Sequence, residues 1–179
     1  MALLNPFPGG ATYKREHFKL YLRLPTGVGG ELESYVIGRD NDDLSPENSW
    51  NEDDFKNVIG EFISNNTLEN ETLSVEPFRL RTDDKLSDIL MSFYINRASG
   101  SDIEFKDGFG AVIMEINPTT GNLEPTSTKA YISSCVILYN PPGGSSTEAL
   151  AMPFTVKLIG IAKPAKFTVA TSDFEEATT

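Results

Sequence analysis

The chain has 179 residues, a hydrophobic fraction of 39%, and 15 basic against 26 acidic residues, which gives a formal net charge of -11. This length suits a single domain, and the acidic balance argues against binding nucleic acid by phosphate neutralisation, which needs a basic face. The sequence holds no apolar run long enough to cross a membrane, and its start "MALLNPFPGG" does not fit a secretory signal. We therefore expect one domain over residues 1–179, made in a cytoplasm, with a flexible N-terminal arm of about residues 1–13.

The first strand is predicted in "HFKLYLRL", which alternates between apolar and polar residues. The face that we expect to be buried holds Phe18, Leu20, Leu22 and Leu24. The opposite face, which we expect to meet solvent, holds His17, Lys19, Tyr21 and Arg23. The turn-rich stretch "PTGVGG" then leads to "ELESYVIG", which is predicted to be the hairpin partner of this strand.

The next stretch, "RDNDDLSPENSWNEDD", has no period, many carboxylates and the only tryptophan. Residues 39–56 are therefore predicted to form a long exposed acidic loop. A calcium loop of the EF-hand type does not fit, because counting from Asp40 puts Asn51 where the bidentate Glu should be. Two strands are predicted after the loop, "FKNVIGEFIS" and "ETLSVEPFRLR", joined by the polar turn "NNTLEN".

The pattern changes within "SVEPFRLRTDDKLSDIL", where apolar residues move from alternate positions to positions three and four apart. This change predicts an α-helix over about residues 83–97, capped by Thr82 or Asp83 and ended by Gly100. One face of the helix is apolar and is expected to cover an open face of the sheet. The residues expected to pack there are Leu86, Ile89, Leu90 and Phe93.

The remaining strands are predicted in "GFGAVIMEI", "TKAYISSCVILY", "LAMPFTVKLIG" and "AKFTVAT", which are separated by clusters of Gly, Pro and Asn. Cys135, the only cysteine, lies in one of these apolar strands, so a buried thiol is expected. Residues from about 172 to 179 are expected to form a frayed acidic tail. Together the segments predict a mainly β fold, an antiparallel sandwich or barrel flanked by one α-helix.

Residues that carry chemistry are few. His17 is the only histidine, so the chain cannot assemble a catalytic triad or a histidine-rich metal site. The glycine clusters "GVGGE" and "PPGGSS" lack the Lys-Ser/Thr ending of a phosphate-binding loop. We therefore predict a protein that is not an enzyme and that needs no metal and no cofactor.

Acidic residues are concentrated in one part of the chain. Between Glu31 and Glu76 lie thirteen acidic residues and only two basic ones, Arg39 and Lys56. A solvated loop accounts for the carboxylates of residues 39–56, but the strands predicted beside it also carry Glu, as in "ELES" and "ETLSVE". This distribution favours an acidic surface with a function of its own.

In its motifs the chain resembles the major tail tube proteins of long-tailed, siphovirus-type bacteriophages and prophages of Gram-positive bacteria. The resemblance runs from about Phe18 to Phe174 and rests, in this order, on "GRDNDDLS", "DDFKNVIGE", "SVEPFRLRTDDKLSDIL" and "MPFTVKLIGIAKPAKFTVATSDF". The third motif is the most specific, because it couples a strand, a cap and a helix at fixed spacing. The family often has a glycine before the last strand, whereas "AKPAKF" here implies a turn at Pro164 and Ala165.

The resemblance implies a structural virion protein. Its copies would close into hexameric rings, and the rings would stack into a tail tube that conducts double-stranded DNA without specific binding. The implied partners are further copies of the chain, a tape measure protein inside the tube, a tail terminator and distal tail or baseplate proteins. The implied location is the virion tail, after synthesis in the cytoplasm of a host bacterium, with no membrane partner.

Two sets of site residues follow from the resemblance. Carboxylates on the polar faces of strands would line the tube and repel DNA, and the candidates are Glu31, Glu33, Glu69 and Glu71. The acidic loop would reach the next ring and order on contact, through Asp40, Asp42, Asp43, Leu44, Trp50 and Phe55.

Two other functions stay open at this point. A tube protein of a contractile injection apparatus or a bacteriocin particle would share the fold, and a sheath gene beside its own gene would identify it. A virion decoration or carbohydrate-binding sandwich belongs to a different class. Such a module would present exposed aromatic side chains on a platform, whereas most aromatic residues here alternate into apolar strand faces.

Overall fold

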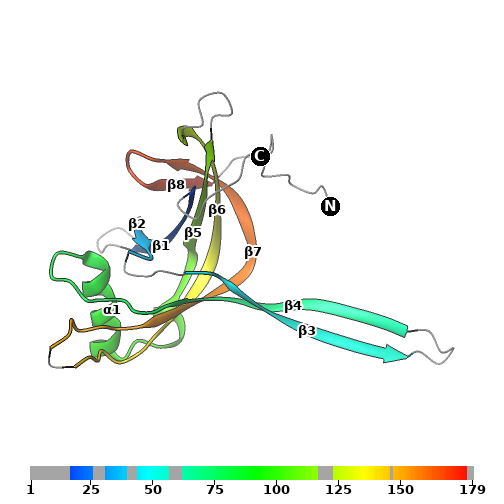
Figure 1. Ribbon diagram of the computed structural model, residues 1–179, viewed down its shortest axis with the longest axis horizontal. Helices are drawn as coiled ribbons and strands as arrows, with labels where there is room; N and C mark the ends of the chain where they lie inside the picture. The colour runs from blue at the N-terminus through cyan, green and yellow to red at the C-terminus, as the bar shows by residue number, and fades with distance from the viewer. Residues whose placement is uncertain are drawn as a thin grey trace. The chain divides into compact units, whose positions relative to one another are not determined.

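The computed structural model describes residues 17–25, 31–39, 44–56, 62–116, 123–145 and 147–176. Its elements in chain order (Figure 1) are β1 (Phe18–Pro25), β2 (Leu32–Ile37), β3 (Glu47–Lys56), β4 (Phe62–Val75), α1 (Lys85–Asn96), the short 3-10 helix η2 (Gly100–Ile103), β5 (Glu104–Ile116), β6 (Leu123–Tyr139), β7 (Phe154–Thr168) and β8 (Asp173–Glu176). Within the described residues the fold is mainly antiparallel β with one α-helix, which confirms the predicted fold class.

The strands follow one another in the sheet in the order β2, β1, β5, β6, β7, β4 and β3, and β8 pairs with β7 outside this path. The predicted hairpin of the first two strands is confirmed, because β1 pairs antiparallel with β2 and places Leu22 opposite Tyr35. On its other side β1 pairs antiparallel with β5, where Leu22 stands opposite Phe109. β2 and β3 therefore form the two ends of the strand order.

The chain divides into two compact units. Unit 1 takes Met1–Arg39, Glu104–Ser134 and Gly160–Thr179, and unit 2 takes Asp40–Ile103 and Cys135–Ile159. The long strands β6 and β7 contribute residues to both. The single domain over residues 1–179 stays a prediction, and the expected N-terminal arm lies outside the described residues.

The core of unit 1 is built on three aromatic rings from β1, β7 and β8. The Tyr21 ring centroid lies 5.3 Å from that of Phe167 and 5.5 Å from that of Phe174, and the two phenylalanine rings are 4.8 Å apart. These are the separations at which tilted and edge-to-face ring pairs attract one another. The same cluster of buried residues includes Val112, Met114, Ala130, Ile132 and Ala165.

The expectation that one face of β1 meets solvent is confirmed at Lys19, which is exposed, and is wrong for the other three residues of that face. Tyr21 and Arg23 are 6% and 8% exposed, and His17 is 6% exposed, although the pattern placed all three on the polar face. The leucines of the other face, Leu20 and Leu22, are buried as expected. β1 is covered on both sides because residues from the far end of the chain, in β7 and β8, pack on Tyr21.

The end of the chain also differs from expectation. Asp173–Glu176 form strand β8 rather than a frayed tail, and Phe174 is buried. The turn expected at Pro164 and Ala165 is wrong, because β7 runs through both and Ala165 pairs with Glu176. One buried phenylalanine in an acidic stretch is too short a pattern to predict a strand by alternation.

Unit 2 has its own buried residues. Glu71–Val75 of β4 pair with Phe154–Leu158 of β7. The inward side chains of this ladder are fully buried, and their burial contributes about 1.5–3 kcal/mol for each large apolar side chain. The side chains of unit 2 that are at most 1% exposed are Leu73, Val75, Leu86, Leu90, Cys135, Ile137, Met152, Phe154 and Val156.

The predicted loop over residues 39–56 is shorter than expected. Its second half, Glu47–Lys56, is strand β3, which pairs antiparallel with β4. The stretch "NNTLEN", expected as a turn, lies within β4, and β4 ends at Val75 instead of running to Arg81. Alternation of apolar residues is weak in both strands, so the pattern on which strand prediction depends is missing.

Candidate assembly surfaces

The most unusual surface is the long pair of strands β3 and β4, which we call the ribbon. β4 pairs with β7 only through Glu71–Val75, while β3 pairs with β4 along its whole length, from Glu47 to Lys56. The ribbon therefore continues as two strands beyond the point where β4 leaves β7 (Figure 1). A two-stranded hairpin is at best marginally stable alone in water. Its strands also carry backbone N–H and C=O groups that a further strand can pair with.

The register of the ribbon is compatible with its charge. The acidic residues of β3 stand opposite neutral residues of β4: Glu52 faces Asn66, Asp53 faces Asn65 and Asp54 faces Ser64. Like charges directly opposite each other would destabilise the pair, and this register avoids them. The register also brings apolar residues opposite each other, at the pairs Trp50–Leu68 and Phe55–Ile63.

The residues predicted to contact the next ring fall into three groups. Asp40, Asp42 and Asp43 lie outside the described residues. Trp50 and Phe55 are in the ribbon, so they belong to a strand and not to a loop that orders on contact. Leu44 is only 3% exposed, so its expected burial by a partner is wrong, because the chain itself already buries it.

The four acidic candidates for a tube lining belong to different units. Glu31 and Glu33 are in unit 1, where Glu31 is exposed just before β2 and Glu33 lies in β2 and accepts a hydrogen bond from the Tyr35 hydroxyl at 3.2 Å. Glu69 and Glu71 are in β4 of unit 2. Glu69 falls at the register shift between the Ser49–Asn70 and Trp50–Leu68 pairs, and Glu71 pairs with residues on both sides.

The residues that cap the two ends of helix α1 differ from those predicted from the sequence. Its N-cap is Asp84, so the prediction of Thr82 or Asp83 is wrong. The buried Ser87 hydroxyl donates a hydrogen bond to the Asp84 carboxylate at 2.9 Å and accepts one from the Arg81 N–H at 3.1 Å. At the other end Arg97 takes a left-handed conformation with φ of 52°, and the Ala98 N–H donates to the Phe93 carbonyl at 2.9 Å. Helices commonly end with one residue in the left-handed conformation, and this residue is most often glycine. Here Arg97 takes that position, so the prediction that Gly100 ends the helix is wrong.

The expected apolar stripe of α1 is buried to different degrees. Leu86 and Leu90 are at most 1% exposed, whereas Ile89 and Phe93 are half-buried. The Phe93 ring lies 6.3 Å from that of Tyr139, whose hydroxyl donates to the Ala98 carbonyl at 2.9 Å. These contacts hold the last turn of α1 against the end of β6 within unit 2.

A second apolar surface on α1 was not predicted. Beside its last turn lies a surface hollow of about 590 Å³, lined by Tyr94, Ile95, Arg97, Tyr139 and Pro141. Tyr94 is 40% exposed and Ile95 is 70% exposed. The signal was present in the sequence, because Met91 and Ile95 are four positions apart and so share a helix face outside the expected stripe.

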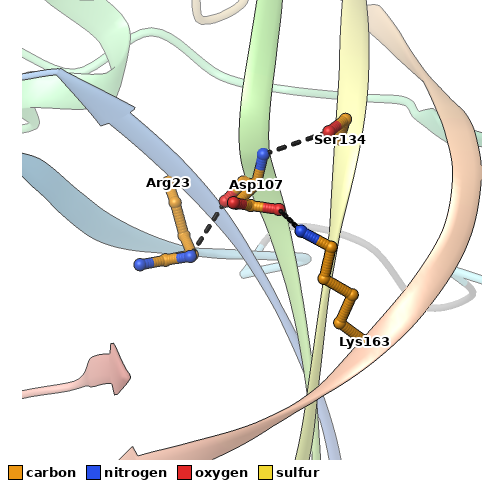
Figure 2. A network of polar contacts seen from close by, with 4 residues as sticks. All are labelled: Arg23, Asp107, Ser134 and Lys163. Atoms are coloured by element: carbon orange, nitrogen blue, oxygen red, sulfur yellow. Dashed lines mark hydrogen bonds and ion pairs between the residues drawn. The ribbon is translucent and has the colours of Figure 1, made fainter. Parts of the chain in front are cut away.

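A polar network in unit 1 joins Arg23, Asp107, Ser134 and Lys163 (Figure 2), and Arg23 extends it to β8. The buried Arg23 guanidinium donates to the main-chain carbonyls of Asp107 at 2.9 Å and of Phe174 at 3.2 Å, and it lies 5.2 Å from the centre of the Phe174 ring. The Asp107 N–H donates to the Ser134 hydroxyl at 3.2 Å, and its carboxylate is 3.5 Å from the Lys163 ammonium. Arg23 therefore joins β1, β5 and β8, although its place in the strand pattern predicted a solvated side chain.

The shifted pKa values of Arg23, Cys135 and Tyr21 agree with their burial, which raises the pKa of the Tyr21 hydroxyl. Burial lowers the pKa of the Arg23 guanidinium, and the carboxylates of Asp107 and Asp173 oppose this shift. Burial raises the pKa of the Cys135 thiol to about 12, which confirms the expectation of a buried, unreactive cysteine.

Neither a metal centre nor a membrane span is found in the part of the chain that the structure describes. Within it, no group of three or more His, Cys, Asp and Glu side chains is placed to hold a metal ion. No helix there has the length and hydropathy needed to cross a membrane.

Comparison with known proteins gives similarity in shape only. No protein-family model matches the sequence, and no curated protein matches it.

Among solved structures, the chain is similar to one in the sheath-tube complex of the PVC extracellular contractile injection system. The two share 12% identity, with a TM-score of 0.48 over 87% of this chain and 93% of that one. A second is in the sheath/tube terminator of that system, with 12% identity and a TM-score of 0.43 over 85% and 95% of the two chains. A third is in the tube-terminating cap of the anti-feeding prophage, with 11% identity and a TM-score of 0.42 over 92% and 99%. Identities and TM-scores this low do not assign the chain to a family.

Proposed function

We propose that this chain is a structural subunit of a tail tube, in which copies close into hexameric rings and the rings stack into a channel for double-stranded DNA. The observation that carries the proposal is the ribbon, which continues beyond the shared ladder of β4 and β7. A protein that worked as a monomer would gain nothing from a long strand pair of this kind, which is exposed to unwanted pairing. In an assembly of copies the same strands have partners.

The motif resemblance agrees with the structure at the positions that matter for folding. In "SVEPFRLRTDDKLSDIL" the buried apolar residues are Val75, Leu86 and Leu90, and Asp84 is the cap of α1. In the last motif Phe154, Phe167 and Phe174 are all buried. The motifs therefore describe a strand end, a helix start and a core, which supports the implied fold and, through it, the tube.

The acidic residues supply a mechanism for conduction. Duplex DNA carries one negative charge per roughly 1.7 Å of its axis, so a basic channel would hold it through counterion release. A channel lined by carboxylates, with Glu33 and Glu71 as the candidates described in most detail, repels DNA and leaves it free to slide. Screening limits this effect to about 8 Å at physiological salt, so only carboxylates at the channel wall contribute.

A carbohydrate-binding or decoration module is disfavoured by the placement of aromatic residues. Tyr21, Phe109 and Phe154 are buried, and among the described aromatic side chains Tyr94, at 40%, is the one that stands out as exposed. A platform for sugars needs several exposed rings. The choice between a phage tail and a contractile or bacteriocin particle depends on whether a sheath gene lies beside the tube gene.

The proposal is tested by negative-stain electron microscopy of the purified chain at low and high concentration, with light scattering alongside. We expect rings at low concentration and hollow tubes at high concentration, since stacking depends on concentration. A chain that stays monomeric at every concentration, and also after addition of the proteins encoded by neighbouring genes, would contradict the proposal.

The lining is tested on the assembled tubes. The double variant Glu33→Lys, Glu71→Lys should form tubes that retain duplex DNA at low salt and release it at high salt. Asp102→Lys, a change of the same sign at an exposed site in η2, is the matched control and should not retain DNA inside the tube. Equal retention by both variants would show that these carboxylates do not line the channel.

A further inference from the structure

The surface on α1 that the proposed function leaves unused is apolar and already formed. Besides the hollow at Tyr94 and Ile95, a smaller one of about 270 Å³ lies one turn earlier, where Met91 meets Leu80 and Leu150. Met91 and Ile95 share a helix face, so both hollows follow the same side of α1. We call this surface the helix groove; it is lined by Leu80, Met91, Tyr94, Ile95, Tyr139 and Leu150.

The helix groove is open to a partner. Ile95, in the larger hollow, is 70% exposed, and Leu150, in the smaller one, is 46% exposed, so each hollow presents a large apolar side chain to solvent. Contacts within unit 2 fix the position of Tyr139, which lines the groove: its hydroxyl donates a hydrogen bond to the Ala98 carbonyl, and its ring packs against that of Phe93. A partner would therefore meet a formed surface and lose little binding energy in ordering it.

The rim of the groove differs in charge from the rest of the chain. Within residues 77–100 there are four basic residues, Arg79, Arg81, Lys85 and Arg97, against three acidic ones, whereas the whole chain has a formal net charge of -11. Arg81 lines the smaller hollow together with the acidic Asp88, and Arg97 lines the larger one, whose lining residues include no acidic side chain. The groove therefore has an exposed basic residue at each end, which favours an acidic partner.

The ribbon has the complementary composition. Residues 47–75 contain seven acidic residues and a single basic one, Lys56. Their register also places apolar residues at paired positions, Trp50 with Leu68 and Phe55 with Ile63. Within unit 2 the ribbon runs away from α1 (Figure 1), so it does not lie in the groove of its own chain.

We propose that the helix groove is the docking site for the ribbon of a second copy of this chain. The inference rests on the proposed function, because it assumes that copies assemble, and it deepens that function by naming the two surfaces that meet. Apolar residues of the ribbon would cover Ile95 and Tyr94, and its carboxylates would approach Arg81 and Arg97. The groove then sets which face of one subunit receives the ribbon of the next.

Disulfide trapping tests this contact directly. One chain carries Ile95→Cys and a second, tagged chain carries Asp53→Cys, and the native Cys135 does not compete because it is fully buried. Mild oxidation of the mixture should give the tagged mixed dimer in at least about tenfold excess over the control, since docking raises the local thiol concentration. The control replaces Ile95→Cys with Val36→Cys, which is exposed on β2 of unit 1. Equal yields from both mixtures would overturn the proposal.

A charge exchange gives an independent arm. Arg97→Glu should reduce the trapped dimer and the yield of assemblies about fivefold or more, and Asp53→Lys with Asp54→Lys in the same chain should restore them. Unfolding curves check that each variant is folded, which we expect because Arg97 is exposed. Failure of the second change to restore assembly would count against pairing of these charges.

The outcomes separate the inference from the proposed function. Tubes that form normally from the wild-type chain without selective trapping would overturn the docking site and leave the tube function standing. Selective trapping without rings or tubes would support the docking site and overturn the tube. If the wild-type chain neither assembles nor traps, both fall.

Discussion

Two antiparallel strand pairs in this molecule are built in opposite ways. In unit 1, β8 has four residues and pairs with β7 only from Ala165 to Thr168, yet Phe174 is buried beneath two further rings. In unit 2, β3 has ten residues and pairs with β4 throughout, yet four of the ten are acidic. Ladder length therefore does not measure how firmly a strand is held, because burial of side chains supplies most of the stability.

The comparison predicts that the short pair is critical for folding. Phe174→Ala should lower the free energy of unfolding by about 3–5 kcal/mol, since it removes a buried ring from the unit 1 core and leaves a cavity. Urea denaturation followed by circular dichroism measures this loss. Val169→Ala, in the exposed turn before β8, is the control and should change the value by less than about 0.5 kcal/mol. A loss below about 1 kcal/mol for Phe174→Ala would show that β8 is not part of the cooperative core.

A second prediction concerns the close packing beneath that ring. A Cβ added at Gly110 would lie 2.4 Å from the Phe174 Cζ atom, so Gly110→Ala should cost about 1–3 kcal/mol by overpacking. At Gly143 a Cβ would meet no heavy atom within 4 Å, so Gly143→Ala should be close to neutral. The combination with Phe174→Leu, which shortens the clashing side chain, should recover part of the loss. Equal effects at both glycines would contradict the packing.

A third prediction concerns Cys135, whose thiol is buried in the core of unit 2. The pKa of Cys135 is raised from 9.0 to about 12, so the folded state keeps a proton that the unfolded state loses, and stability should fall as pH rises from about 9 to 12. Cys135→Ala should show a shallower decline over this range than the wild type. A thiol reagent at pH 8 should label the wild-type chain only after it unfolds, and rapid labelling of the folded protein would contradict the burial.

The smallest effect on stability is expected in the ribbon. Trp50→Ala should change the free energy of unfolding by less than about 1 kcal/mol, because β3 forms one end of the strand order and pairs with β4 alone within the described residues. The same variant should reduce the length or yield of tubes in electron micrographs. An unfolded monomer would instead show that Trp50 belongs to the core of a single chain, and the contrast between the two strand pairs would then fail.

The sequence predicted the strands that alternate clearly and the helix that changes the period. β1, β5 and β6 follow apolar alternation, and α1 follows spacings of three and four with Asp84 at its start. These signals are local, so the residues that produce them lie within one element.

What the sequence could not predict depends on contacts between distant segments. β3 carries four carboxylates in ten residues and is a strand because β4 pairs with it at a register that separates like charges. Tyr21 and Arg23 are buried because β7 and β8 cover the face that alternation assigned to solvent. Trp50 and Phe55 were predicted to lie in a loop because the pairing of β3 with β4 has no signal in the sequence of β3 alone. The groove at Ile95 was not predicted because Met91 and Ile95 lie on a face of α1 outside its main apolar stripe.

The division of the chain has a consequence for the order of events during synthesis. Unit 2 is complete once Ile159 has been made, whereas unit 1 also needs the residues from Gly160 onward. Arg23 and Phe174, which meet in unit 1, are 151 positions apart, and contacts over such separations form slowly. We therefore expect the aromatic cluster of unit 1 to form late in folding, because Tyr21 must meet Phe167 and Phe174 from the far end of the sequence.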